Sequence, residues 1–585
     1  MPTQAAPRKN GRQEAAHLYD ELEERLLARD QEGGSRIYYE LLRRGCPLPE
    51  IMAEAVRIHA PYTHVPYHQR IDDGFPNFVN NDHCLLSSRA AINLQKMLPG
   101  KLAGLPLAQT IWYIPTGLDI WNQKILKAPG HYATRGYKMP NATPPAPVVY
   151  WPDQAPLKES GSLDERLNNW LTLVERGQVI DAYRTFLGLM EDTEHRKEVL
   201  AQLVFAGMID VQDRMLYNRS YTTGHKAYRA RSVVEIGNAV GWDNAHDVIY
   251  AGALDIAVGP RWHSVYEIAC NVVTIFIDGK EVHAVPQSGT TERERELLAN
   301  TGTLSEDQTA DLVEVLTQQH EPAYIEKISA LLLVGKSPRR IVDAIQLAAA
   351  RVVLETEGPN NFSMPQHTYE YCNTLRWFYD NFAHPQRLKL LYVAGSMVNQ
   401  AAWNQRNSGW FNSQRISAPS GVDRMSGNQI IERLEAALIA LDPPASVAWT
   451  KAYIDSGEDR LTLVQRLALM ASRFGNDPHN QEIPQCLLED YAKNRCRDRA
   501  RLLLACTHIS AAHRKYGDTF EASRRFGEAM GCKGVRVEEP AGLRPALHDA
   551  LAARQPAVID VRTSLKVTFA DITSQLAKDA SPRRR

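Results

Sequence analysis

Apolar residues recur at three- and four-residue intervals along most of the chain. Clear cases are residues 47–60, 337–355 and 430–442, and proline or glycine bounds each stretch. This periodicity is typical of amphipathic helices, whose ends proline and glycine mark. The pattern therefore predicts a mainly α fold.

Three stretches depart from the helical pattern. Residues 272–286 place Asp278-Gly279 between β-branched runs, which predicts a β-hairpin. Residues 520–564 have the order helix, strand, helix, strand, which predicts a small C-terminal α/β unit. The proline-rich residues 139–152 indicate a linker.

The helical segments repeat along the chain. Residues 41–56 align with residues 331–346 at a glycine, a proline, an isoleucine and several small residues, and in both copies a histidine later opens another helix. His83 and His225 are 142 residues apart, and so are His225 and His367. The copy around His225 differs internally, so part of this equality is attributed to chance.

A more divergent fourth copy places His479 in the same role. We therefore predict a mainly α protein of three or four divergent helical repeats with a small C-terminal α/β unit. The predicted parts are repeat 1 at residues 1–150, repeat 2 at 151–305, repeat 3 at 306–440, a degenerate repeat 4 at 441–522, and the α/β unit at 523–585.

Charge and composition narrow the possible partners. The 585 residues include 67 Lys and Arg against 68 Asp and Glu, a balance that argues against nucleic acid as the main partner. Apolar runs are shorter than the roughly 20 residues of a membrane span, and the N-terminus has no apolar signal core. Eight cysteines without a C-x-x-C motif indicate reduced thiols. We expect a cytoplasmic protein with no membrane partner, and the oligomeric state stays open.

The repeated histidines are the first candidates for chemistry. Neutral imidazole is a common metal ligand, and several around one pocket would suit non-haem iron or zinc. A second alignment, of residues around His246 and His384, adds one histidine to each of two repeats. Only a closed, ring-like arrangement would bring His83, His225 and His367 together. Pairs within one repeat, His225 with His246 and His367 with His384, are therefore favoured. The alternative is that each histidine is a structural joint.

Two further stretches hold candidate metal ligands. His64 and His68 precede Asp72 and Asp73, which together resemble a facial site of two histidines and one carboxylate, or a loop pinned by His–Asp hydrogen bonds. Farther along, His263 precedes Glu267 by four residues. On a helix such a pair faces one side, where it ligates a metal, acts in acid–base chemistry, or forms only a surface hydrogen bond.

Aromatic residues indicate where an apolar ligand would bind. Trp262 and Tyr266 flank the start of a predicted helix, and Trp403 and Trp410 lie in or beside a Gly/Ser/Asn-rich stretch. Loops of this composition often form lids or recognition surfaces. We expect these four side chains to contact a hydrophobic substrate.

The order of helix, histidine, helix and then "GWDNAHDVIYAGALDIAVG" (241–259) resembles the questin oxidase-like proteins. The likeness rests on residues 222–260 and 363–400, under a fifth of the chain. It implies an all-helical body and an oxygen-dependent oxidation of a hydrophobic, aromatic substrate. The matching positions, taken as catalytic candidates, are His225, His246, His367 and His384.

The C-terminal residues 520–564 resemble the C-terminal segment of thiamine diphosphate enzymes of the acetolactate synthase type. That family's G-D-G motif, followed by two asparagines some 25 residues later, is missing upstream. The resemblance therefore does not carry thiamine diphosphate to this chain.

These observations predict an oxidoreductase of the oxygenase type, with a hydrophobic small molecule in a histidine-lined cavity between helical repeats. Iron or haem are candidate cofactors, and metal ligands are expected among His64, His68, His83, His225, His263 and His367. A cofactor-free enzyme that uses the histidines as bases stays open. The alternatives are a non-catalytic helical scaffold that binds a partner protein and an accessory subunit of a thiamine enzyme.

Overall fold

The computed structural model falls into two compact units, residues 1–516 and 517–585. It describes residues 15–63, 70–72, 75–77, 83–120, 154–211, 224–257, 264–281, 289–357, 364–412, 416–474, 478–512, 533–537, 540–552 and 557–561. The predicted linker at 139–152 lies outside these ranges.

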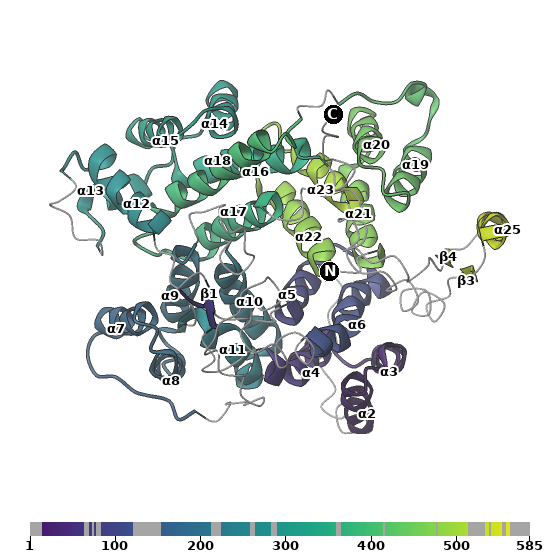
Figure 1. The fold of residues 1–585 in the computed structure, drawn as a ribbon, viewed down its shortest axis with the longest axis horizontal. Coiled ribbons are helices and arrows are strands. Elements are labelled where there is room, and N and C mark those ends of the chain that lie inside the picture. Colours follow the sequence, from purple (N-terminus) through teal and green to yellow (C-terminus); the bar gives the residue numbers. More distant parts are fainter. Residues whose placement is uncertain are drawn as a thin grey trace, which may run out of the picture. The chain divides into compact units, whose positions relative to one another are not determined.

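The first unit is built almost wholly of helices, as predicted, in an order that recurs four times (Figure 1). Each set begins with two helices packed on one another and continues with three more. The first set is α2 (Ala16–Leu27), α3 (Gln31–Arg43), α4 (Leu48–His59), α5 (His83–Gln95) and α6 (Leu105–Ile120). The second is α7 (Leu163–Glu175), α8 (Val179–Met190), α9 (Arg196–Ile209), α10 (His225–Val240) and α11 (His246–Ala253).

The third set is α14 (Glu306–Gln318), α15 (Ala323–Leu333), α16 (Pro338–Glu355), α17 (Met364–Asn381) and α18 (Leu390–Asn407). The fourth is α19 (Gly427–Ile439), α20 (Pro443–Asp455), α21 (Arg460–Phe474), α22 (Pro478–Lys493) and α23 (Arg501–Ala512). This order groups α19 with the fourth set, whereas the predicted repeat 4 begins at residue 441.

Short elements connect these sets. They are η1 (Ala60–Tyr62), the antiparallel pair β1 (Arg70–Asp72) and β2 (Phe75–Asn77), η2 (Gly100–Gly104), η6 (Trp242–Asn244), η7 (Leu254–Ala257), α12 (Ser264–Val272), η8 (Val273–Ile277), α13 (Glu292–Leu298) and η11 (Val422–Arg424). Among the described helices, none is long and apolar enough to cross a bilayer.

The glycines that the sequence alignment matched end equivalent helices. Gly45 follows α3 with φ +78°, and Gly335 follows α15 with φ +83°. After each glycine, the next backbone N–H donates to the carbonyl five residues earlier at 3.0 Å. This left-handed helix ending favours glycine, since a side chain there is strained. The two aligned positions therefore have the same structural role.

The fourth helix of each set faces a common centre. Helix α5 packs against α10 and α22, and α17 packs against the same two helices. These contacts form a closed cycle, which Figure 1 shows as a ring of α5, α10, α17 and α22 with the other helices outside it. The four repeats thus have the closed arrangement that convergence of the histidines requires.

The spacing of 142 residues also relates other residues that contact one another in the ring of helices. Asn93 Nδ2 donates to Glu235 Oε2 at 2.9 Å, and Arg231 Nη1 donates to Asn373 Oδ1. Both bonds join residues that are 142 positions apart. Adjacent helices of the ring therefore place corresponding residues side by side.

The predicted hairpin at 272–286 is wrong where the structure describes it. Residues Val273–Ile277 continue α12 as a π-helix, and Thr274 Oγ1 donates to the carbonyl of Cys270 at 2.9 Å. Val273, Thr274 and Ile277 are buried there. A short apolar run is compatible with a buried helix as well as with a strand, so its β-branched composition does not determine which of the two forms.

The second unit contains two strands and one helix among its described residues. Strand β3 (Lys533–Val537) pairs in parallel with β4 (Ala557–Val561), with Val535 opposite Ile559. Helix α25 (Pro540–Ala552) connects the strands and packs against both.

A buried ionic network joins three helices of the ring. Glu489 of α22 forms ion pairs with Arg231 Nη2 of α10 at 2.8 Å and with Arg376 Nη2 of α17 at 2.6 Å. Arg376 Nε also donates to Asp490 Oδ1 at 2.8 Å. Although burial opposes ionisation, the two guanidinium groups hold the pKa of Glu489 well below its usual value. The network therefore ties α10, α17 and α22 by charge as well as by packing.

Replacing Arg231 with methionine should lower the free energy of unfolding by about 3 kcal/mol, because it removes one of the two cations on a buried carboxylate. Arg497→Ala is the matched control, since Arg497 pairs with Glu306 while their side chains are 80% and 65% exposed. The control should not change stability measurably. Denaturant unfolding followed by circular dichroism measures both, and equal effects would contradict the assigned role of the buried network.

Candidate metal centre

Each repeat contributes a histidine from the start of its ring helix. His83 and His225 are the first residues of α5 and α10, and His367 and His479 lie in the first turns of α17 and α22. Because the four helices surround one centre, side chains at these positions meet. The prediction that His479 has the same role as the other three is therefore consistent with its position.

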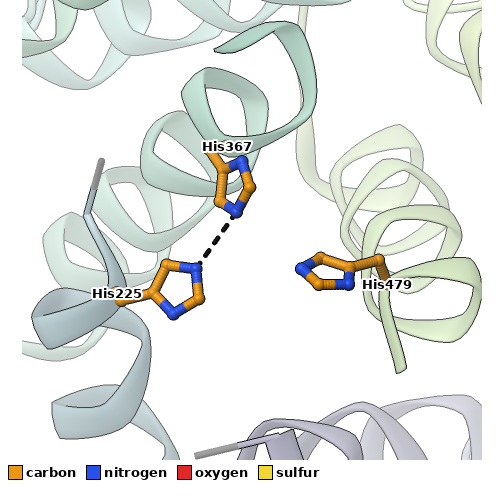
Figure 2. A group of neighbouring side chains, drawn as sticks. All are labelled: His225, His367 and His479. Carbon is orange, nitrogen blue, oxygen red and sulfur yellow. Dashed lines mark hydrogen bonds between the residues drawn. The ribbon is translucent and has the colours of Figure 1, made fainter. Parts of the chain in front are cut away.

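Three of these imidazoles form a tight, buried group (Figure 2). The Nε2 atoms of His225 and His367 are 3.1 Å apart, and a nitrogen of His479 completes a set within 4.8 Å. The three residues are only 3–5% exposed. Figure 2 shows the rings of His225 and His479 approaching His367 from separate helices.

His83 extends this group toward a carboxylate. Its ring centroid lies 4.5 Å from that of His479 and 5.8 Å from that of His225. His83 Nδ1 is 3.9 Å from Glu482 Oε1. Ligand atoms of His83, His479 and Glu482 form a second set within 4.8 Å, so the two sets share His479.

The Glu482 side chain is fully buried beside these imidazoles. Neither carboxylate oxygen has a hydrogen-bond partner among the residues that the structure describes. An ionised carboxylate without a partner is costly to bury, and a cation in contact with it would offset that cost. The surroundings of Glu482 therefore favour a bound cation.

The donor atoms suit a transition-metal ion. Three imidazoles are the protein ligands of many zinc centres, and two imidazoles with one carboxylate are those of non-haem iron oxygenases. Two nitrogens bound to one ion at about 2.1 Å are themselves about 3.0–3.4 Å apart. The 3.1 Å between His225 and His367 fits this separation, and it also fits a direct hydrogen bond between the rings.

The residue before His225, Gly224, has a backbone angle and a packing environment that require glycine. Gly224 has φ +111°, and a Cβ there would lie 2.6 Å from the hydroxyl of Tyr228. That hydroxyl donates to the backbone carbonyl of His367. Any larger residue at position 224 would displace Tyr228 and with it the link between α10 and α17.

The expected pairs within one repeat are not formed. His246 is exposed at the start of α11. His384 is buried and stacks on Phe205 with ring centroids 4.0 Å apart. Its Nε2 hydrogen-bonds Gln202 Oε1 at 2.9 Å, and its Nδ1 accepts from the backbone N–H of Gln386. The histidines that meet come from different repeats, because the ring closes, whereas His384 is a structural joint.

The predicted substrate contacts are dispersed. Tyr266 is buried, with its ring against Phe205 and its hydroxyl bonded to Gln386. Trp403 and Trp410 are 43% and 40% exposed, near the end of α18. The remaining predicted residues, His64, His68, Trp262 and His263, lie outside the described ranges.

Sequence reasoning missed Glu482, the carboxylate of the centre, and its equivalent Glu370. Each follows a histidine of the cluster by three residues, in "HNQE" and "HTYE". On a helix this spacing puts both side chains on one face. The repeated H-x-x-E pattern was the available signal.

Comparisons with protein-family models, with curated proteins and with solved structures found no match to this chain. The resemblances to questin oxidase-like proteins and to thiamine diphosphate enzymes therefore remain predictions.

The His384 site predicts a loss of stability in acid. Burial, and then the nearby charges of Arg387 and Lys389, lower the pKa of His384 to about 3. The unfolded chain has a histidine pKa of about 6.5 and therefore binds the proton first. Stability from this site is present above pH 6.5 and declines by roughly 1.4 kcal/mol per pH unit toward pH 3. His384→Gln, which keeps a donor for Gln202, should flatten this part of the pH–stability curve measured by thermal melting. A curve as steep as that of the unmodified protein would exclude His384 as a source.

Proposed function

We propose that this protein is a metal-dependent oxidoreductase of the oxygenase type, with its ion held by residues of the four-histidine cluster and Glu482. The observation that carries the proposal is the convergence of imidazoles from four repeats. Ligand atoms of two of them, His83 and His479, lie within 4.8 Å of the fully buried Glu482, whose oxygens accept no hydrogen bond from the described residues. A bound ion would supply the activation of dioxygen. The chain would supply the ligands, the compensating negative charge and the surrounding dry environment.

The cluster differs from histidines that serve as joints. His384 and His508 each have a neutral hydrogen-bond partner, and His508 Nε2 lies 2.9 Å from the carbonyl of Thr356. In the cluster, by contrast, imidazoles lie beside imidazoles: the ring centroids of His225 and His367 are 5.1 Å apart, and those of His479 and His83 are 4.5 Å apart. Several basic rings in one buried place repel one another when protonated, whereas a shared ion uses their lone pairs together.

The spacing favours a bare ion over haem. The 3.1 Å between the Nε2 atoms of His225 and His367 is too short for a haem to lie between these two imidazoles. A site with two histidines and one carboxylate leaves coordination positions for dioxygen and substrate. The resemblance to questin oxidase-like proteins supports oxidation of a hydrophobic, aromatic substrate.

A non-catalytic scaffold is the second candidate. It is favoured by the hydrogen bond between His225 and His367, which satisfies one nitrogen of each ring without an ion. In that case the cluster would stabilise the closed ring of repeats and nothing more.

Metal analysis separates the two candidates. The purified protein should contain about one equivalent of iron or zinc per chain, and the double variant His225→Ala/His367→Ala should lose it. His246→Ala is the control, because this exposed histidine lies in the same repeat as His225 but away from the cluster. A metal-free protein whose cluster variants only melt at lower temperature would support the scaffold instead.

An open coordination position can be tested without a known substrate. The protein loaded anaerobically with Fe(II) should bind nitric oxide and give the S = 3/2 paramagnetic resonance signal of a ferrous nitrosyl. Glu482→Gln should weaken Fe(II) binding at least tenfold, since it removes the anionic ligand. Fe(II) that binds tightly but gives no nitrosyl signal would identify a closed, structural metal site.

A further inference from the structure

Two carboxylates of the ring occupy equivalent positions but have different surroundings. Glu370 follows His367 by three residues, and Glu482 follows His479 by three. Both side chains are at most 1% exposed. Helical bundles that bind two metal ions use a similar donor set, in which glutamate and histidine three residues apart project from facing helices. The ring of helices therefore holds the same residue types at the same three-residue spacing, in the reverse order.

Only one of these carboxylates is available to a metal. Glu482 belongs to a set of ligand atoms within 4.8 Å, together with His83 and His479. Glu370 belongs to neither of the two such sets found among the described residues. Its Oε1 instead accepts a hydrogen bond from Arg89 Nη2 at 2.9 Å.

Arg89 lies inside the ring of helices, farther along α5 than His83. It follows His83 by six residues on α5, and its side chain is 0% exposed. Besides Glu370 on α17, it reaches Gln485 on α22, with Nη1 3.3 Å from Oε1. Although burial opposes its charge, nearby negative groups that include Glu370 and Glu482 raise its pKa. Arg89 is thus a buried cation paired with Glu370.

Residues at the same position in the other repeats do not have this role. The four residues that follow a ring histidine by six are Arg89, Arg231, Asn373 and Gln485. Arg231 pairs with Glu235 and Glu489, farther along the helices from the histidines. Among these equivalents, Arg89 is the one whose guanidinium binds a carboxylate of an H-x-x-E pair.

We propose that Arg89 limits the centre to one metal ion by holding Glu370 and by placing its positive charge where a second ion would bind. This inference rests on the proposed metal centre and adds its stoichiometry. When Arg89 is replaced by an uncharged residue, Glu370 loses this guanidinium partner, and we expect it to bind a cation together with a histidine of the cluster. The protein then binds two ions, and the second compensates the charge that Arg89 no longer provides.

The test is a titration of the metal-free full-length protein with Co(II), by equilibrium dialysis and visible absorbance. The unmodified protein should bind one equivalent and Arg89→Met two. Arg89→Met/Glu370→Gln, which removes both charges, should return to one, and Glu370→Gln alone should stay at one. Melting curves with and without Co(II) check folding, and Co(II) should raise the melting temperature of Arg89→Met more than that of the unmodified protein.

The outcomes separate this inference from the proposed function. One equivalent in both the unmodified protein and a folded Arg89→Met overturns the role of Arg89 and leaves the metal centre intact. Two equivalents in the unmodified protein also overturn the role of Arg89. Loss of Co(II) in Glu370→Gln overturns it too, because Glu370 would then be a ligand in the unmodified protein. No Co(II) bound by the unmodified protein overturns the metal centre itself. If Arg89→Met does not fold, Arg89→Gln takes its place: two equivalents in that variant support the inference, and one equivalent overturns it.

Discussion

The contact between α5 and α22 is the constraint on which the candidate centre depends. It joins the first and fourth repeats through polar groups inside the ring. Ser87 Oγ donates to Gln481 Oε1 at 3.0 Å, across 394 residues of sequence, and Gln481 Nε2 donates to the carbonyl of Pro106 at 2.9 Å. Without the contact between α5 and α22, the four helices would form an open array, in which His83 and His479 would lie at opposite ends. Closure therefore creates the site, and the site exists only when the whole ring has folded.

The sequence predicts the local parts of this structure well. Helical periodicity gives the mainly α fold, and the aligned glycines Gly45 and Gly335 end equivalent helices. The equal histidine spacing is also visible in the sequence, because duplicated helices keep their internal register. Convergence is not visible, since periodicity shows which face of a helix is buried but not whether a series of repeats closes.

Two errors in predicting the site have the same origin. The predicted partner of His384 is His367 of the same repeat, but its actual partners, Phe205 and Gln202, come from the preceding repeat. Glu482 was overlooked because an i,i+3 pair on a helix is common and most such pairs only stabilise the helix. In both cases the deciding contacts are between repeats, and no pattern within one segment specifies them.

The polar interior of the ring explains how divergent repeats keep the centre aligned. Burying charged groups gains little stability over apolar packing, but it penalises any arrangement that leaves one of them unpaired. A shift of one residue along a helix rotates each side chain by about 100° and would break the bonds of Asn93 to Glu235 and of Arg231 to Asn373 together. Because the histidines lie on the same helices, about two to three turns away, these bonds also fix where the imidazoles point. Repeats with little sequence in common can thus still bring their histidines together, because these polar contacts hold each helix in register.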